Sequence, residues 1–73
     1  MTIEIDDDLM TLEIDGDIIA RAVKRPDGWW EVSCWPKFLD RNQAITSLTV
    51  AELLASGYSS DNPAVMALRE ELR

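Results

Sequence analysis

Carboxylates are the only abundant side chains in this 73-residue chain that could perform acid–base or metal chemistry. The longest run of them is Asp6-Asp7-Asp8, and residues 15–17 read Asp-Gly-Asp. Carboxylate oxygens suit Mg²⁺ and Ca²⁺, but a magnesium site draws one or two of them from a rigid frame. A calcium loop needs acids at fixed positions and a glutamate six residues after its glycine, and the sequence lacks that spacing. We therefore predict that the acidic run is solvated and that the chain holds no metal.

Histidine and cysteine chemistry is limited by the residue counts. The sequence has one cysteine, Cys34, and no histidine, so a zinc site of the usual kind and a Ser-His-Asp or Cys-His nucleophile are excluded. A hydrolase with paired carboxylates would need a cleft, which a chain of this length rarely builds. We therefore predict that the protein is not an enzyme and has no cofactor, and that Cys34 is a small core residue.

Three tryptophans within seven residues, Trp29, Trp30 and Trp35, are the most unusual local feature. On a strand, alternation would direct Trp30 to the inner face of the sheet and the other two to the outer face. Aromatic and arginine side chains together are typical of protein-interface hot spots, and Arg25 opposite Trp29 could add a cation–π contact. The residues predicted to bind a protein partner share this outer face: Trp29, Trp35, Arg21, Arg25, Glu31, Ile19 and Val23.

Two other uses of this region stay open. The acidic N-terminal residues or the pair Lys37-Phe38 could fold over the outer face and cover it. Residues 21–41 also carry five bases against three acids, and aromatic side chains beside bases can stack on single-stranded nucleic acid. The net charge of −7 opposes binding to phosphates. A protein partner is therefore the first prediction, and a nucleic-acid-associated regulator using the basic patch of residues 21–41 is the alternative.

Apolar residues that alternate with polar ones predict a three-stranded antiparallel meander over residues 9–36. An Asp-Gly pair and a Pro-Asp-Gly run separate the alternating segments, and both favour hairpin loops. The expected segments are a strand around 10–14, a three-residue loop at 15–17, a strand at 18–25, a three-residue loop at 26–28 and a strand at 29–35. The expected partners are Ile14 and Ile18, Leu12 and Ala20, and Met10 and Ala22 in the first hairpin, and Lys24 and Trp30, Ala22 and Val32, and Ala20 and Cys34 in the second. In this register every strand presents apolar side chains to one face of the sheet.

Helical spacing of apolar residues replaces this alternation in the second half of the chain. One helix is predicted at about 40–56, with Asp40 or Asn42 as its cap, and a Thr-Val-Ala-Glu run allows a restart at Thr49. The other is predicted at about 63–72, after an Asn-Pro pair that suits a helix start.

The predicted fold class is α+β. A three-stranded antiparallel β-meander, with room for a short fourth N-terminal strand, would pack against two C-terminal α-helices. Residues 1–8 would form an acidic arm or short edge strand, and residues 9–73 would form a single small domain.

The negative charge is concentrated at the N-terminus. Residues 1–20 hold seven acids and no base, whereas residues 21–73 hold seven of each. We expect this charge to steer the protein toward a basic partner. The lone cysteine, the lack of a long apolar run and a start without the features of a secretion signal predict a cytoplasmic protein with no membrane partner.

Two sequence blocks carry a resemblance to known proteins. They are Gly-Trp-Trp-Glu-Val-Ser-Cys-Trp-Pro at 28–36 and Arg-Asn-Gln-Ala-Ile-Thr-Ser-Leu-Thr-Val-Ala-Glu at 41–52, and the chain ends in Arg-Glu-Glu-Leu-Arg. Over residues 26–73 the chain resembles small uncharacterised proteins of actinobacteria and their phages. The resemblance implies a phage or prophage accessory protein and assigns no catalytic residue. The expected partner is then a host protein or another phage protein met in the host cytoplasm, and a homodimer through the outer face or an edge strand is also allowed.

Overall fold

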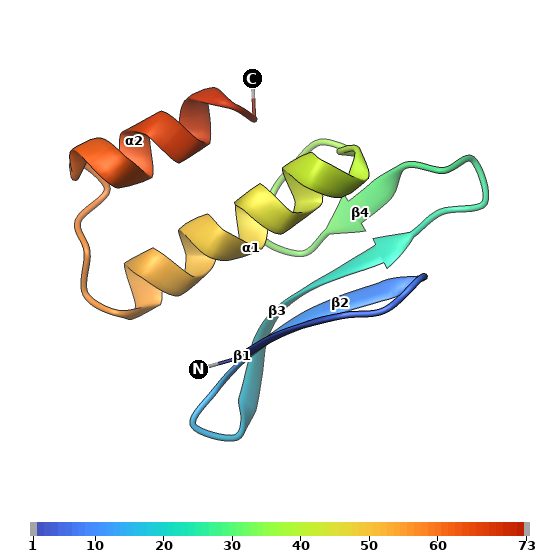
Figure 1. The fold of residues 1–73 in the computed structure, drawn as a ribbon, viewed down its shortest axis with the longest axis horizontal. Helices are drawn as coiled ribbons and strands as arrows, with labels where there is room; N and C mark the ends of the chain where they lie inside the picture. Colours follow the sequence, from blue (N-terminus) through green and yellow to red (C-terminus); the bar gives the residue numbers. More distant parts are fainter. Residues whose placement is uncertain (1, 73) are drawn as a thin grey trace.

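A four-stranded antiparallel sheet carries both helices on one of its faces in the computed structural model, which describes residues 2–72 (Figure 1). The strands lie in chain order: β1 (Thr2–Ile5), β2 (Leu9–Ile14), β3 (Asp17–Lys24) and β4 (Trp30–Val32). Helices α1 (Arg41–Ala55) and α2 (Pro63–Glu70) follow. The predicted α+β fold is confirmed, including the fourth N-terminal strand. The parts of the predictions that concern Met1 and Arg73 lie outside the described residues.

Strand β1 joins the acidic N-terminal segment to the sheet. It pairs antiparallel with β2, so that Ile3 lies opposite Leu12 and Ile5 lies opposite Met10. Both β2 residues are fully buried, and Ile3 packs against the core beside them. The N-terminal segment is therefore an edge strand rather than a free arm, and its three consecutive aspartates form the turn into β2.

The first hairpin turns through two residues, Asp15 and Gly16, and not through the three that the sequence predicted. Their φ angles of +52° and +86° are those of a type I′ turn, which an Asp-Gly pair favours. As a result Ile14 pairs with Asp17 instead of Ile18, and the predicted Ile14–Ile18 pair is wrong.

A β-bulge then restores the expected register. The pairing shifts by one residue next to Glu13, so that both Leu12–Ala20 and Met10–Ala22 form as predicted. At this bulge one residue has no partner on the opposite strand. The side chains beside it are turned away from the core as a result. Ile18, predicted on the inner face, is consequently 60% exposed.

The second hairpin confirms the predicted loop. Gly28, at a φ of +91°, closes it, with the Gly28 N–H donating to the Arg25 oxygen at 3.0 Å and the Arg25 N–H donating to the Trp29 oxygen at 2.7 Å. Lys24 faces Trp30, as expected, and Ala22 faces Val32. 

Strand β4 ends earlier than expected. It stops at Val32, because a turn in which the Trp35 N–H donates to the Val32 oxygen at 3.2 Å follows at once. The predicted Ala20–Cys34 pair does not form, and the alternation of side chains is broken before Trp35.

Helix α1 is continuous from Arg41 to Ala55, so the restart at Thr49 is wrong. Asp40 caps it as predicted: its Oδ1 accepts the Gln43 N–H at 2.7 Å, and the Gln43 side chain accepts the Asp40 N–H at 3.3 Å. Asn62 caps α2 by accepting the Ala64 N–H at 2.9 Å. Helix α2 ends at Glu70, two residues before the predicted end.

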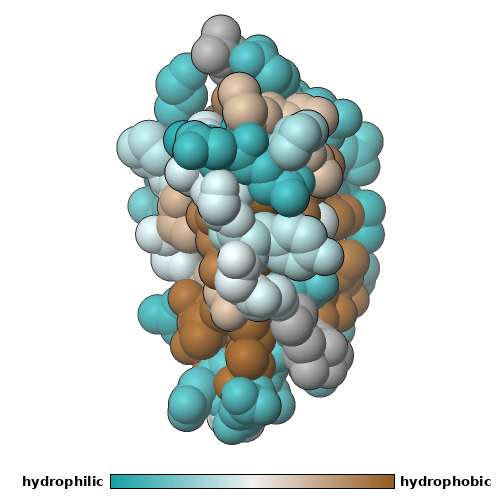
Figure 2. Space-filling model, turned by 90° about the vertical axis from the view of Figure 1, so that its left-hand side faces the viewer, coloured by the Kyte–Doolittle hydropathy of each residue, from teal (hydrophilic) through white to brown (hydrophobic). Residues whose placement is uncertain are grey.

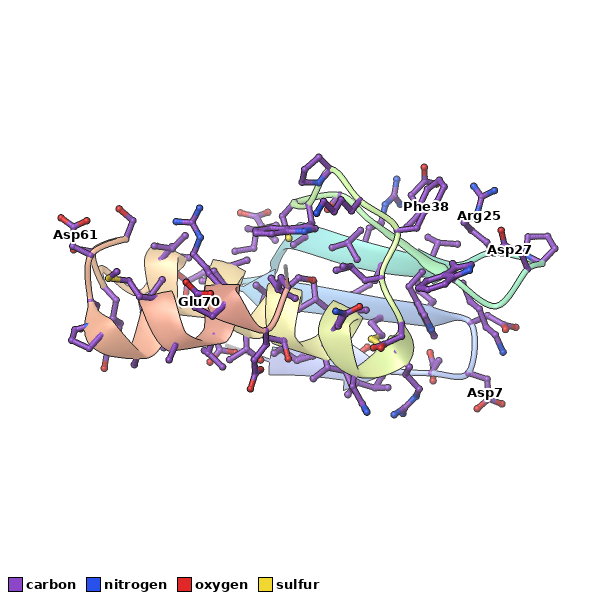
Figure 3. All side chains as sticks on the ribbon, turned by 90° about the horizontal axis from the view of Figure 1, so that it is seen from above. Asp7, Arg25, Asp27, Phe38, Asp61 and Glu70 are labelled. Carbon is purple, nitrogen blue, oxygen red and sulfur yellow. The ribbon has the colours of Figure 1, made fainter. Side chains whose placement is uncertain are left out.

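The core lies between the inner face of the sheet and α1, and α2 packs on α1. Its buried apolar side chains are Met10, Leu12, Ala20, Ala22, Trp30, Val32, Leu39, Ala44, Leu48 and Leu72. Both helices lie on the same side of the sheet (Figures 1 and 3). The opposite face of β2 and β3 is therefore left without a helical cover.

Candidate protein-binding surface

The side chains that point away from the helices form a surface that we call the outer sheet face, defined by Leu9, Ile19, Arg21, Val23 and Glu31. The register places Val23 between Leu9 on one neighbouring strand and Glu31 on the other. Arg21 lies one step along β3, opposite Thr11. Four of the seven residues predicted to bind a partner lie on this face, as predicted: Ile19, Arg21, Val23 and Glu31.

Three apolar side chains on this surface are open to solvent. Leu9 is 39% exposed, Ile19 is 46% exposed and Val23 is 45% exposed. Single exposed apolar residues are ordinary, but an antiparallel sheet covered on one face commonly carries polar residues on the other. Figure 2 shows apolar atoms gathered just above the hydrophilic tip of the β2–β3 hairpin, at the end of the sheet where Ile18 and Ile19 are exposed. The apolar character of this face is the main departure from a solvated sheet.

Arg21 is held through its backbone. Its N–H donates to Ser33 Oγ at 3.0 Å, and the Ser33 N–H donates to the Arg21 oxygen at 2.9 Å. Two shallow hollows of about 300 and 290 Å³ flank Arg21 along the outer sheet face. One is also lined by Ile19 and the other by Val23 and Glu31. Shallow hollows on either side of a cationic side chain can receive side chains from another surface.

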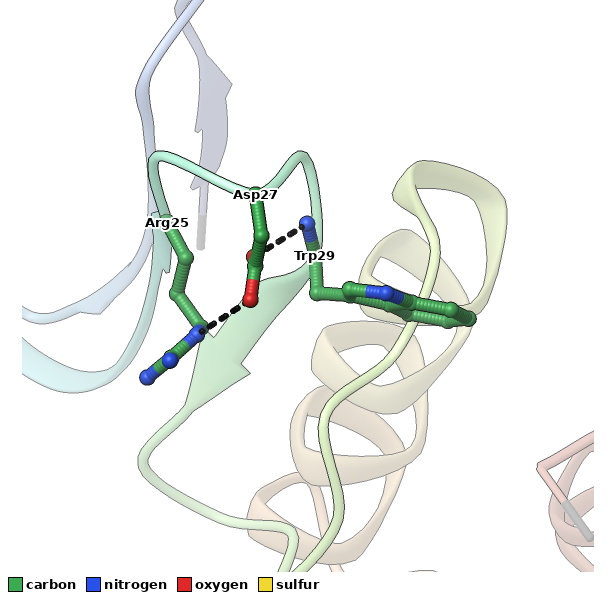
Figure 4. Close-up of polar contacts among 3 residues, drawn as sticks. All are labelled: Arg25, Asp27 and Trp29. Atoms are coloured by element: carbon green, nitrogen blue, oxygen red, sulfur yellow. Dashed lines mark hydrogen bonds and ion pairs between the residues drawn. The ribbon is translucent and has the colours of Figure 1, made fainter.

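Asp27 organises the loop of the second hairpin (Figure 4). Its Oδ1 accepts the Trp29 N–H at 3.1 Å, and its Oδ2 accepts Arg25 Nε at 3.3 Å. The hydrogen bond from the Trp29 backbone, followed by the bond and charge of Arg25, lowers the pKa of Asp27 below its ordinary value of 3.8. The Asp27 carboxylate therefore holds both the Arg25 side chain and the Trp29 backbone.

This arrangement predicts a pH-dependent contribution of Asp27 to stability. Because its pKa is lowered in the folded protein, the contribution is present at neutral pH and is lost as pH falls through the lowered pKa. We expect the wild type to have a higher unfolding temperature than Asp27→Asn at neutral pH, and this advantage to disappear once the pH falls below the lowered pKa of Asp27. Circular dichroism melts of both proteins across this pH range provide the measurement. An advantage that persists unchanged in acid would show that the carboxylate charge has no part in holding the loop.

The cation–π partner of Arg25 differs from the predicted one. Its guanidinium carbon lies 4.1 Å from the centroid of the Phe38 ring, and Figure 3 shows both side chains at the same end of the sheet. A backbone bridge brings Phe38 there: the Trp30 N–H donates to the Leu39 oxygen at 2.7 Å, and the Leu39 N–H donates back at 3.0 Å. The predicted Arg25–Trp29 stacking is wrong, although the two backbones do lie opposite each other.

Phe38 covers Arg25 but not the rest of the surface. Trp29 remains 49% exposed and lines an open depression of about 440 Å³ with Pro36, Lys37 and Phe38. We call Arg25, Asp27, Trp29 and Phe38 the hairpin cluster. The alternative in which Lys37-Phe38 covers the outer face is realised only at Arg25, since Ile19 and Val23 stay exposed.

Trp35 does not lie on the outer sheet face, and its predicted placement is wrong. The early turn after Val32 reverses its direction, so that its ring packs against the core on the helical side. Its Nε1 is buried and has no hydrogen-bond acceptor among residues 2–72. It also lines a depression of about 390 Å³ between the β4–α1 connection and α2, together with Ser60, Asp61, Met66, Arg69 and Glu70.

Cys34 is exposed, so its predicted place in the core is also wrong. It sits on the turn that ends β4, where its Sγ lies 3.9 Å from the Ser47 oxygen of α1. Partial burial against the helix raises the pKa of the thiol above its ordinary value of 9.0. A raised pKa leaves less thiolate at neutral pH and gives no support to a nucleophilic role.

Sequence reasoning missed one residue of the outer sheet face, Leu9, and it named Phe38 as a possible cover but not as the stacking partner of Arg25. Leu9 directly follows the acidic run, and its register opposite Val23 was the signal that could have placed it on the outer face. Phe38 comes to Arg25 only through the bridge between Trp30 and Leu39, which no local pattern indicates.

Among the described residues, no group of three or more His, Cys, Asp and Glu side chains could hold a metal ion. Neither helix in residues 2–72 has the length and apolar character needed to cross a bilayer. No family model, curated protein or solved structure matches the chain. The resemblance to actinophage proteins stays a prediction, and the function has to be argued from this surface.

Proposed function

We propose that this protein is a small non-enzymatic binding module that contacts another protein through the outer sheet face and the adjoining hairpin cluster. The observation that carries the proposal is the bare sheet face itself, where Leu9 and Val23 lie opposite each other, Ile19 lies further along β3, and each is between 39% and 46% exposed. Burying apolar surface contributes about 25 cal/mol per Å². A contact that covers these side chains therefore has a driving force that the isolated chain does not use.

The hairpin cluster supports the same function by pre-organisation. Tryptophan and arginine are the residues that most often dominate binding energies, and the Asp27 carboxylate here accepts one hydrogen bond from the Arg25 side chain and one from the Trp29 backbone. The Arg25 side chain is already held in the free protein and therefore loses less conformational freedom on binding. The cluster borders the outer sheet face at the end of β3, so one partner could contact both.

The biological setting follows from the sequence resemblance. A phage or prophage accessory protein would meet a host protein, or another phage protein, in the host cytoplasm and would modulate or inhibit it. The seven acids of residues 1–20, most of which lie on β1, β2 and their turns, would accelerate encounters with a basic partner.

A capture experiment with matched variants tests this function. The immobilised protein is exposed to host lysate as the wild type, as the double variant Ile19→Ser with Val23→Ser, and as the control Met66→Ser, which removes an apolar side chain that is 55% exposed on α2. We expect the wild type and the control to retain the same partner and the double variant to lose it. Equal capture by all three proteins would place the binding surface elsewhere.

A salt titration distinguishes the nucleic-acid alternative from the protein-binding function. Binding of a labelled single-stranded oligonucleotide through residues 21–41 would weaken log-linearly as salt rises. An aromatic-centred protein contact lacks this steep dependence. We expect no oligonucleotide binding at low salt, and binding with a steep salt slope would favour the regulator over the protein-binding module.

A further inference from the structure

The sheet has an open edge at β1. Within residues 2–72, β1 pairs with β2 alone and stands first in the strand order. Backbone N–H and C=O groups on such an edge are available to a strand from another chain. The opposite edge is closed at Trp30 of β4, which exchanges two hydrogen bonds with Leu39. Strand β1 is therefore the edge to which another strand can be added.

The hydrogen-bond pattern identifies the backbone groups that point outward from β1. The Asp6 N–H donates to the Leu9 oxygen at 2.8 Å, so these two residues form a hydrogen-bonded pair. In an antiparallel ladder such pairs alternate with pairs that exchange no hydrogen bond. Counting back along the register, Ile5 and Ile3 belong to pairs of the second kind. Their N–H and C=O groups therefore point away from β2, toward the open edge.

The side chains of β1 alternate between the two faces of the sheet. Ile3 and Ile5 lie on the inner face, opposite core residues of β2, and Ile5 is 43% exposed. Helix α1 packs on β2, β3 and β4, so the inner side of β1 has room for further apolar side chains. Glu4 lies on the outer face, and Asp6 follows two positions later on the same face. Both acidic residues are exposed.

The charge around this edge has a single sign. Residues 1–20 contain seven acids and no Lys or Arg, and none of these acids forms an ion pair within the described part of the chain. Figure 3 shows Asp7, in the turn after β1, at the edge away from Arg25. A second copy of β1 would place Glu4 close to like charge, which destabilises a sheet. A basic segment would instead meet uncompensated negative charge.

We propose that β1 binds an extended segment of another protein in which basic side chains alternate with apolar ones, and that this segment joins the sheet as a fifth strand. Its backbone bonds to Ile3 and Ile5, which is the strand-addition mode of peptide recognition. Its apolar side chains lie beside Ile3 and Ile5, and its Lys or Arg side chains lie beside Glu4 and Asp6. This edge is separate from the outer sheet face and the hairpin cluster, so the inference goes beyond the proposed function.

The length of β1 limits the strength of this contact. The strand has four residues, and small interfaces are weak and transient. We therefore expect a free peptide to bind at high micromolar to millimolar concentration and to dissociate rapidly.

A titration with designed peptides tests the proposal. The probe is a synthetic peptide in which lysine alternates with valine, and the control peptide has the same composition with its lysines and valines in separate blocks. Amide hydrogen exchange of the isotope-labelled protein is measured by NMR. We expect the alternating peptide to slow exchange at Ile3 and Ile5 and to leave Glu4, whose amide already bonds to β2, unchanged. The block peptide should leave all three amides unchanged.

Three variants make the titration specific to this edge. Ile5→Pro removes an outward N–H at a position where an edge strand tolerates proline, and Glu4→Lys reverses the charge beside the bound strand. We expect each to weaken binding of the alternating peptide by about tenfold. Asp61→Lys makes the same change of charge in the connection between α1 and α2 and should change binding by less than about twofold. Far-ultraviolet circular dichroism confirms that every variant is folded.

Three results would overturn the site at β1. They are unchanged exchange at Ile3 and Ile5 with millimolar peptide, equal binding of the block peptide, and equal weakening by Glu4→Lys and Asp61→Lys. The last two would show attraction by net charge alone.

The double variant Ile19→Ser with Val23→Ser separates this inference from the proposed function. We expect it to bind the alternating peptide as the wild type does, although it should lose the lysate partner. If it loses the peptide as well, the peptide lies on the outer sheet face and the site at β1 is overturned. If it keeps both, the site at β1 stands and the proposed function is overturned.

Discussion

Replacing Trp30 with alanine is expected to remove a large part of the protein's free energy of unfolding. Trp30 is 2% exposed and is the largest of the fully enclosed side chains in the core. Truncating a buried tryptophan to alanine costs about 3–5 kcal/mol. At about 0.05–0.15 kcal/mol per residue, a chain of this size is stable by roughly 4–11 kcal/mol. Urea denaturation followed by circular dichroism measures the loss.

The neighbouring residue provides the matched control for this substitution. Trp29 has the same side chain but is 49% exposed in the hairpin cluster. We expect Trp29→Ala to lower the free energy of unfolding by less than about 1 kcal/mol, as is usual for exposed positions. Equal losses at the two positions would mean that the alternation along β4 is not the one described.

Replacing Trp35 with serine is the second substitution expected to have a large effect. Its ring packs against the core on the helical side, so the loss of this apolar surface should cost about 2–3 kcal/mol. Trp35→Phe should cost much less, because it keeps an aromatic ring and removes an Nε1 that is buried without an acceptor among the described residues. Chemical denaturation of both variants gives the comparison.

This experiment also distinguishes the structure from the sequence-based placement of Trp35. A residue on the outer sheet face could be changed to serine with little loss of stability and a loss of binding. We expect the reverse: a clear loss of stability. A Trp35→Ser variant as stable as the wild type would contradict the turn after Val32, which directs the Trp35 ring toward the core.

Most of the fold follows from local patterns in the sequence. Alternation of apolar residues predicted three of the four strands, and Pro26-Asp27-Gly28 predicted the second hairpin loop with its correct register. Asp40 and Asn62 predicted where the two helices begin, because their side chains satisfy backbone N–H groups at the first turn. These features depend on neighbours in the chain, which is why the sequence alone indicates them.

The sequence-based predictions were wrong where a segment was compatible with two turn structures, or where the sequence carried only a weak signal for a turn. Asp15-Gly16 is compatible with a two-residue or a three-residue loop, and a bulge beside Glu13 compensates for the shorter one. The turn after Val32 contains Ser33 but no glycine, proline or asparagine, and this weaker signal did not outweigh the alternation that continues to Trp35. One early turn was enough to misplace both Cys34 and Trp35.

The candidate surface was only partly predictable for the same reason. Ile19, Arg21, Val23 and Glu31 share a face through simple alternation along β3 and β4, which a sequence reveals. The stacking of Arg25 on Phe38 depends on the Trp30–Leu39 bridge, which joins residues on either side of a turn. The absence of a cover over Leu9 and Val23 depends on where both helices pack, and this is a property of the whole molecule.

The most direct measurement of whether the outer sheet face carries the contacts is a pair of amide NMR spectra of the isotope-labelled wild type, recorded with and without unlabelled host lysate. When the lysate is added, we expect the signals of Leu9, Thr11, Arg21 and Val23 to shift or broaden, and the signals along α2 to stay unchanged. The same amides should not respond in Val23→Asp. Changes confined to the helices, or no change when the lysate is added, would contradict a contact surface on this face of the sheet.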